Sequence, residues 1–267
     1  MTKPGSRQLF EDILAYEGPA LVADVLQPWA AASEYAIFLA ALPATPSVEE
    51  NWELYALSRV LDVLTLRWQP NNRADGSDWP GPDISLAEYQ DFISLLGLEA
   101  FHPVSYHPFA SEILAAQAGA ENFKLADCFF PGIRLRNKLL KRAGLGVLLN
   151  PADYNLALVN GATGYWTYRR KNRPYRDLSH GWGNNSQWRT ALRLDCETAD
   201  AFCYNPQGRH QLHHPTPELL QKLNDENLTL AEAIELTVNR QFITCAKDDT
   251  DLFPYDFAYE QRKDSVY

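Results

Sequence analysis

The spacing of apolar residues changes partway along this chain, and the change restricts the fold more than any other feature. In the first half, apolar residues recur every three or four positions, as in Leu54, Leu57, Leu61 and Leu64. This is the spacing of a helix with one buried face. After about residue 155, apolar and polar residues alternate as in half-buried strands. The sequence therefore predicts an α+β fold, with a mainly helical N-terminal half and a small antiparallel sheet, flanked by helices, in the C-terminal half.

Helix starts are marked by capping residues. A Ser or Thr followed by Glu three positions later can satisfy two free amides at a helix N-terminus, an arrangement called a capping box. The sequence has three such pairs, Ser47 with Glu50, Ser85 with Glu88, and Thr229 with Glu232. Thr216 followed by Pro217 also suits a helix start. Further helices are expected over residues 6–16, 20–41, 108–118 and 133–145. In the last of these, cations alternate irregularly with apolar residues, as on an amphipathic helix.

Two β-hairpins are expected in the C-terminal half. In the first, Asn160 and Gly161 lie between two strand-like runs within residues 155–170. The Asn-Gly pair suits a two-residue turn whose central residues have positive φ. In the second, residues 191–196 alternate as a strand, and a short polar turn leads to a second strand over residues 201–205.

The charge of the chain falls into three blocks. The net charge is −11 over residues 1–119, +9 over 120–193 and −8 over 194–267. We expect an acidic helical region over 1–119 and an α+β region with antiparallel hairpins over 120–267, either as two units or as one continuous domain. The basic block has two interpretations: it packs between acidic neighbours that neutralise it, or it forms a local positive field that attracts an anionic ligand.

Composition and missing motifs exclude several classes of protein. The chain has neither an apolar run at its start nor eighteen consecutive apolar residues, so no signal peptide, membrane span or membrane partner is expected. Its four cysteines form no CxxC pair, which indicates reduced thiols in a cytoplasmic protein. Residues 143–150 contain only G-x-G, and no Walker lysine follows a glycine-rich loop. No nucleotide or other cofactor is therefore expected.

The stretch from Asp177 to Thr190, which reads DLSHGWGNNSQWRT, is the main candidate site. It combines indole rings, amides and an arginine fork that could recognise an anionic ligand. The candidate ligand-binding residues are Arg176, His180, Trp182, Asn184, Asn185, Gln187, Trp188 and Arg189. Asp177, Ser179 and His180 form a poor catalytic triad, because such triads are usually assembled from separate segments and no G-x-S-x-G motif is present. In the alternative interpretation, both Trp side chains pack into the core and the amides stabilise turns.

A histidine-rich stretch is the other polar cluster. His210, His213 and His214 follow Cys203 and precede Glu218. Zinc accepts such ligands, but no recognised zinc motif is present and the following prolines favour a solvent-facing loop. No metal site is therefore expected.

Three functions remain open, and the sequence does not decide whether the chain is an enzyme. The leading hypothesis is a cytoplasmic binding protein with a basic protein partner, as an inhibitor or immunity protein would have, because two acidic blocks and many aromatic residues suit such a partner. The second is an enzyme that acts on a small anionic substrate through residues 176–190. The third is a nucleic-acid binder that uses the basic and aromatic residues 165–176, a function disfavoured by the net charge of −10.

Overall fold

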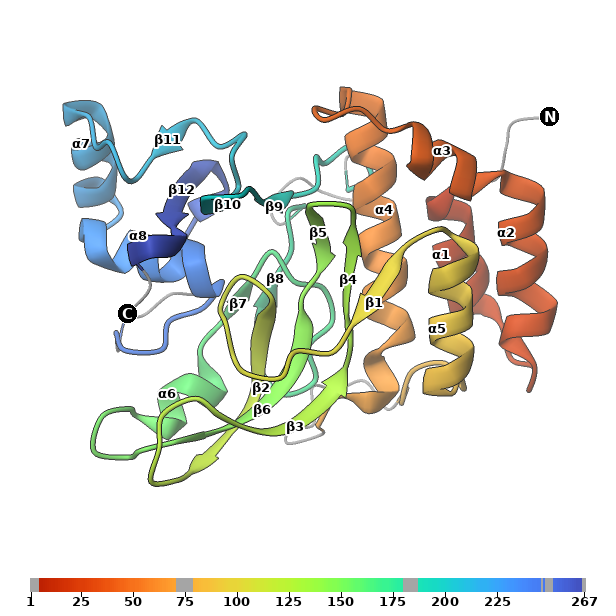
Figure 1. The fold of residues 1–267 in the computed structure, drawn as a ribbon, viewed down its shortest axis with the longest axis horizontal. Helices are drawn as coiled ribbons and strands as arrows, with labels where there is room; N and C mark the ends of the chain where they lie inside the picture. The colour runs from red at the N-terminus through yellow and green to blue at the C-terminus, as the bar shows by residue number, and fades with distance from the viewer. Residues whose placement is uncertain (1–4, 71–78, 180–186, 246, 248–251, 266–267) are drawn as a thin grey trace.

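A computed structural model of the chain describes residues 5–70, 79–179, 187–245, 247 and 252–265. Helices of the N-terminal region pack together at one end, strands occupy the middle, and two C-terminal helices lie at the other end (Figure 1). The α+β fold and the helical N-terminal region predicted from the sequence are confirmed. None of the described helices is long and apolar enough to cross a membrane.

The helices begin where the sequence provides caps. The N-terminal helices are α1 (Ser6–Ala15), α2 (Gln27–Ser33), α3 (Tyr35–Ala41), α4 (Val48–Leu64) and α5 (Leu86–Leu95), with a π-helix, η1 (Val22–Leu26), and a 3-10 turn, η2 (Leu66–Trp68). The later ones are α6 (Leu156–Gly161), α7 (Pro217–Asp225) and α8 (Leu230–Asn239), with 3-10 turns η3 (Pro254–Asp256) and η4 (Lys263–Ser265). All three predicted capping boxes are present with both hydrogen bonds, and the Thr216 side chain caps α7.

One cap provides a direct test of this sequence signal. The Ser85 hydroxyl accepts from the Glu88 amide at 3.2 Å, and the Glu88 carboxylate accepts from the Ser85 amide at 2.9 Å. Ser85→Ala is expected to lower the free energy of unfolding by about 1 kcal/mol, because an amide at the start of α5 loses its partner. Ser94→Ala near the end of the same helix is the matched control, and urea unfolding of both variants measures the difference. Equal losses would contradict the capping role.

The strands of the described residues form three sheets. Their bounds are β1 (Glu99–Phe101), β2 (Ser111–Ala118), β3 (Lys124–Phe130), β4 (Gly132–Leu135), β5 (Lys138–Lys141), β6 (Ala143–Leu149), β7 (Gly164–Tyr165), β8 (Tyr175–Arg176), β9 (Asp195–Glu197), β10 (Ala201–Tyr204), β11 (His210–Gln211) and β12 (Phe257–Arg262). The largest has the order β1-β4-β5-β9-β10-β12-β11, the second β2-β6-β3, and the third β7-β8. Most neighbours are antiparallel, as predicted, but β2 with β6, β7 with β8 and β11 with β12 are parallel.

Several predicted elements are wrong. Residues 20–41 do not form one helix, because Glu34 adopts a left-handed conformation with φ of 50° and separates α2 from α3. Residues 108–118 contain strand β2 instead of a helix. Residues 133–145 form the hairpin β4–β5 and the start of β6. Every residue of β5 is buried, so its lysines lie inside the protein and the strand lacks the alternation that would have identified it.

The first predicted hairpin is also absent. Asn160 and Gly161 end helix α6, which the Asn155 side chain caps by accepting from two backbone amides. The Asn160 side chain exchanges two hydrogen bonds with the Ala116 backbone of β2, at 2.8 and 2.9 Å, so it joins α6 to the sheet instead of forming a turn. The second hairpin is confirmed in part: β9 pairs with β10, with Cys196 opposite Cys203, but residues 191–194 of the predicted first strand lie outside any strand.

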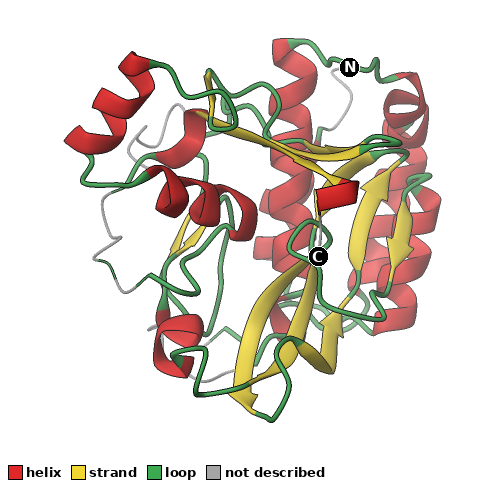
Figure 2. Cartoon of the chain, turned by 60° about the vertical axis from the view of Figure 1, so that its left-hand side comes forward, coloured by secondary structure: helices red, strands yellow, loops and turns green. Residues whose placement is uncertain are grey.

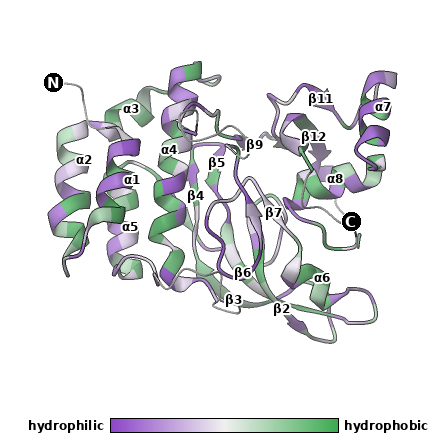
Figure 3. Cartoon of the chain, turned by 180° about the vertical axis from the view of Figure 1, so that it is seen from behind, coloured by the Kyte–Doolittle hydropathy of each residue, from purple (hydrophilic) through white to green (hydrophobic). Residues whose placement is uncertain are grey.

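The largest hydrophobic core joins the N-terminal helices to the sheet. Side chains from α1, α4 and α5 pack there with Ile133 and Leu135 of β4 and Leu140 of β5. The strands lie against these helices, while α7 and α8 lie on the other side (Figure 2). Hydrophobic and hydrophilic residues alternate around the N-terminal helices, as expected for helices with one buried face (Figure 3).

Candidate functional site

The segment that contains the predicted site is attached to helix α4 by Arg59, which is only 4% exposed. The Arg59 guanidinium forms an ion pair with Asp177 and donates to the Ser179 hydroxyl at 2.7 Å. Its other terminal nitrogen donates to the Gln187 side chain at 3.3 Å. Both sides of the segment are therefore attached to one buried cation, and Ser179 serves this attachment.

Aromatic rings surround the same guanidinium. The Arg59 side chain lies 4.5 Å from the ring centroid of Tyr168 and 4.9 Å from those of Tyr55 and Trp188. Trp188 also makes an edge contact with Phe10, at 5.1 Å between centroids. Trp188 is half-buried against the helical core. The described part of the segment therefore packs against the core, as in the alternative interpretation in which the Trp side chains are structural.

The structure places the other predicted residues as follows. Arg176 ends β8 and donates to the carbonyl of Tyr175 at 3.0 Å, while Arg189 lies 5.8 Å from the centroid of the Trp52 ring. His180, Trp182, Asn184 and Asn185 lie outside the described residues. No described contact links Arg176 to Arg189, so a shared ligand site at residues 176–190 stays a prediction.

The histidine-rich stretch lies at β11 and the turn after it. The rings of His213 and His214 are 4.4 Å apart, and His210 faces Phe257 of β12. Within the described ranges, no group of three or more His, Cys, Asp or Glu side chains could hold a metal ion.

Six of the thirteen cations in the basic block of the sequence are buried, and several of them contact buried carboxylates. Asp195 of β9 is fully buried and accepts from Arg193 at 2.7 Å and from Arg240 at 3.0 Å, with Arg142 at 3.5 Å. Burial raises the pKa of this carboxyl, but the three guanidinium groups outweigh it and hold the pKa well below its usual range. The carboxylate is therefore charged throughout the physiological range.

A second buried carboxylate, Asp62 of α4, has a similar environment. It pairs with Lys141 of β5 and with Arg170, whose guanidinium also contacts both Glu112 oxygens at 2.9 Å. Asp62 also accepts from the Tyr168 amide at 3.2 Å. The acid on α4 and the cations of the basic block thus join the helical region to the sheets, which supports the interpretation that acidic neighbours neutralise part of this block.

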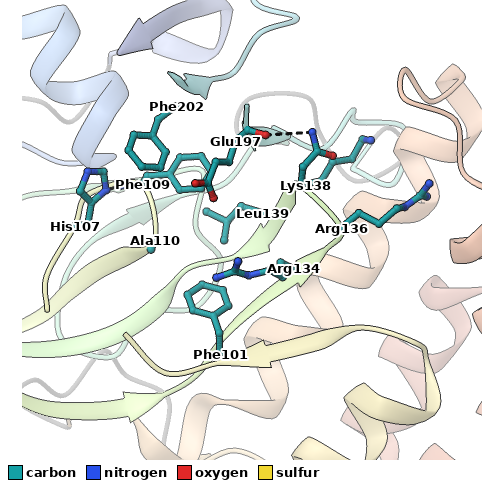
Figure 4. Close-up of a pocket in the computed structure, with 11 residues that line it drawn as sticks. Phe101, His107, Phe109, Ala110, Arg134, Arg136, Lys138, Leu139, Glu197 and Phe202 are labelled. Carbon is teal, nitrogen blue, oxygen red and sulfur yellow. Dashed lines mark hydrogen bonds between the residues drawn. The ribbon is translucent and has the colours of Figure 1, made fainter. Parts of the chain in front are cut away.

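An open pocket of about 230 Å³ lies above β5, between the sheet and the turn before β2 (Figure 4). Phe101, Phe109 and Phe202 provide apolar walls, and His107 and Glu197 provide polar groups. This volume is below the range of about 300–1,000 Å³ typical of ligand sites, so the pocket suits a ligand with a single ring.

The charged groups around this pocket are partly engaged elsewhere. Arg134 lies 4.2 Å from the centroid of the Phe101 ring, and Arg136 points toward the N-terminal helices, where it donates to the carbonyls of Leu39 and Leu42 (Figure 4). Glu197 pairs with Lys263 at 2.7 Å. The sequence did not reveal this pocket, because its walls come from distant segments.

His107 is expected to be neutral at pH 7. Burial is the main reason that its pKa is lowered from 6.5, with a further contribution from Arg142, while Glu197 opposes the shift. Its Nδ1 accepts from the Phe109 amide at 3.2 Å, so the ring proton of the neutral form lies on Nε2 and can be donated to a ligand.

This assignment can be checked by an NMR titration of the His107 ring. We expect a pKa below 6.5 in the wild type and a still lower pKa in Glu197→Gln, because the favourable carboxylate charge is removed. Free imidazole in the same buffer provides the reference titration. A His107 pKa that rises in Glu197→Gln would contradict the assignment.

Comparisons with protein-family models, curated proteins and solved structures found no match to this chain.

Proposed function

We propose that this chain is a binding protein that recognises a basic protein partner through its acidic surface. The observation that carries the proposal is the burial of the cations. Seven described cations are buried, namely Arg59, Lys138, Lys141, Arg142, Arg170, Arg173 and Arg193, against two buried acids, Asp62 and Asp195. The buried residues therefore carry a net charge of +5, and because the whole chain carries −10, all its other residues together carry −15.

Such a surface supports association by electrostatic attraction. A strong negative field accelerates the encounter with a basic partner and disfavours acidic ones. Helix α1 offers one candidate contact area, because Glu11, Asp12 and the following Glu17 are exposed there beside Leu14, which is 38% exposed. Apolar side chains within a charged surface are typical anchors of an interface. A cytoplasmic location with reduced thiols remains part of the proposal.

The test begins with the partner captured by crosslinking at low salt and then purified. The association rate constant with the purified chain is expected to fall on the order of tenfold between 50 and 300 mM salt. Two sets of neutralising substitutions then locate the surface. The α1 set is Glu11→Gln, Asp12→Asn and Glu17→Gln, and the matched distant set is Glu218→Gln, Asp225→Asn and Glu260→Gln. We expect the α1 set to slow association more than the distant set.

An association rate constant that changes neither with salt nor with the α1 set of substitutions would contradict the proposal. It would mean that the acidic surface does not contribute to recognition. Equal slowing by both sets would retain charge steering but exclude α1 as the contact area.

The pocket of Figure 4 supports a second candidate, the binding of a small ligand with one aromatic ring. Three phenylalanine side chains could stack on the ring, and the Nε2 proton of His107 could be donated to a polar atom of the ligand. Phe202→Ala should weaken the binding of such a ligand, detected by calorimetry with a library of single-ring compounds. The nucleic-acid alternative gains no such support, because none of residues 165–176 is fully exposed.

A further inference from the structure

A cavity of about 30 Å³ lies between α4, β5 and the residues that follow β7. Its charged and polar lining includes Asp62, Lys141, Arg142, Trp166, Arg170 and Arg240. The Asp62 network described above closes one end of this cavity. Arg142 and Arg240, two of the three arginines that contact Asp195, also line the cavity, and we call their side of it the arginine end.

Several polar nitrogen atoms at the arginine end have no hydrogen-bond partner among the described residues. They are Nε and Nη1 of Arg142, Nε of Arg240 and Nε1 of Trp166. Arg142 is 2% exposed and Trp166 is 7% exposed, so bulk water does not compensate for the missing partners. Buried donors without partners are rare in native proteins and indicate an unobserved water or ion.

The charges at this end are also unbalanced. Three guanidinium groups face the single carboxylate of Asp195, which leaves an excess of two positive charges. At the Asp62 end, by contrast, the pairs of Asp62 and Glu112 with Lys141 and Arg170 balance in number. Burial lowers the pKa of Arg142 to about 10 and that of Arg193 to about 9, so both groups are still cationic at neutral pH.

We propose that this cavity binds one small inorganic anion of the size of chloride, held by Arg142, Arg240 and the Trp166 indole. The volume supports this size, since about 10–15 Å³ is needed for one water-sized probe. Water alone could accept the unpaired N–H groups but would leave the excess positive charge in place. An anion satisfies both requirements, and the N–H groups of arginine and indole are suitable donors to it. The inference is independent of the proposed protein partner.

The experiment measures urea unfolding at constant ionic strength while sodium chloride replaces sodium gluconate. Urea is used because guanidinium chloride would itself supply the anion. The unfolding midpoint is expected to stay constant at chloride concentrations below the dissociation constant and to rise with the logarithm of the chloride concentration above it, because the ligand binds the folded state. Trp166→Phe should raise the chloride concentration at which this rise begins by about tenfold, since one donor to the anion is lost.

Tyr255→Phe is the matched control. Tyr255 contacts the Trp166 ring at 5.5 Å and has a buried hydroxyl without a described partner, but it does not line the cavity. Its midpoint should begin to rise at the same chloride concentration as that of the wild type. A midpoint that does not respond to chloride, or a rise that begins at the same chloride concentration in all three proteins, would overturn the proposal.

A second measurement does not depend on any variant. Crystals grown in sodium bromide should show an anomalous peak beside Arg142 and Trp166. A cavity with no such peak would also overturn the proposal, whatever the unfolding curves show.

Discussion

Asp195→Asn is expected to lower the free energy of unfolding by about 3–5 kcal/mol, the largest effect of any single substitution considered for this chain. The change keeps the shape of the side chain but removes the charge that faces Arg142, Arg193 and Arg240. Three cations are then left close together in a buried site. Urea unfolding measures the loss.

The control for Asp195 is Asp264→Asn, whose carboxylate pairs with Arg262 at the surface with 73% of its side chain exposed. Surface pairs contribute about 0–1 kcal/mol, so the control should change little. A similar effect of both substitutions would show that the Asp195 cluster does not stabilise the fold.

The pH dependence follows from the same cluster. The folded-state pKa of Asp195 lies below its unfolded value of about 3.9, so its stabilisation is fully present above that pH. It is lost as the pH falls below the unfolded value toward the folded one. The wild type should therefore lose stability steeply below about pH 4, whereas Asp195→Asn should have a flatter curve in this range. Parallel curves would contradict the role of Asp195.

Arg59→Ala is expected to have the second largest effect, about 3 kcal/mol or more. The substitution leaves the Asp177 carboxylate without its ion pair and removes the cation between three aromatic rings. Backbone amides of residues 187–189 should also exchange with solvent faster, because Gln187 and Trp188 lose their contact to α4. Unfolding curves and hydrogen exchange measure the two effects.

Two further variants separate charge from geometry at this position. Arg59→Lys keeps the charge but loses the planar fork, so it should recover only part of the stability. Arg67→Ala, at a surface pair in which the Arg67 side chain is 47% exposed, should have little effect on either measurement. Unchanged exchange at residues 187–189 in Arg59→Ala would contradict the anchoring role.

Local signals in the sequence were sufficient for the capped helices. Ser47, Ser85 and Thr229 satisfy amides within their own helices, so neighbouring residues determine the outcome. The β9–β10 hairpin was also predictable, because residues 191–205 show alternation followed by a polar turn.

Tertiary contacts explain the failures. Lys138 and Lys141 indicated a solvated helix face, yet both are buried in β5, and Lys141 pairs with Asp62, which is 79 residues away in the sequence. Asn160 indicated a turn, but its side chain bonds to Ala116 of another element. These partners lie far away in the sequence, so no local pattern could predict the contacts.

The sequence predicted only part of the candidate sites. The segment Asp177–Thr190 was recognised as unusual, but Arg59, which anchors its described part, carried no signal in the sequence. The charge blocks did indicate a concentration of cations. Whether these cations formed a surface or a core depended on Asp62 and Asp195, which belong to the two acidic blocks.

Chemical modification of arginine tests most directly whether the cations described as buried are internal and the surface is therefore acidic. Phenylglyoxal labelling, followed by mass spectrometry, compares two groups of residues. We expect Arg142, Arg170, Arg173 and Arg193 to react only as fast as the whole protein unfolds, while Arg7, Arg209 and Arg262, whose side chains are 61%, 77% and 64% exposed, react at once. Equal labelling rates in the two groups would contradict the buried basic core and remove the basis for an acidic binding surface.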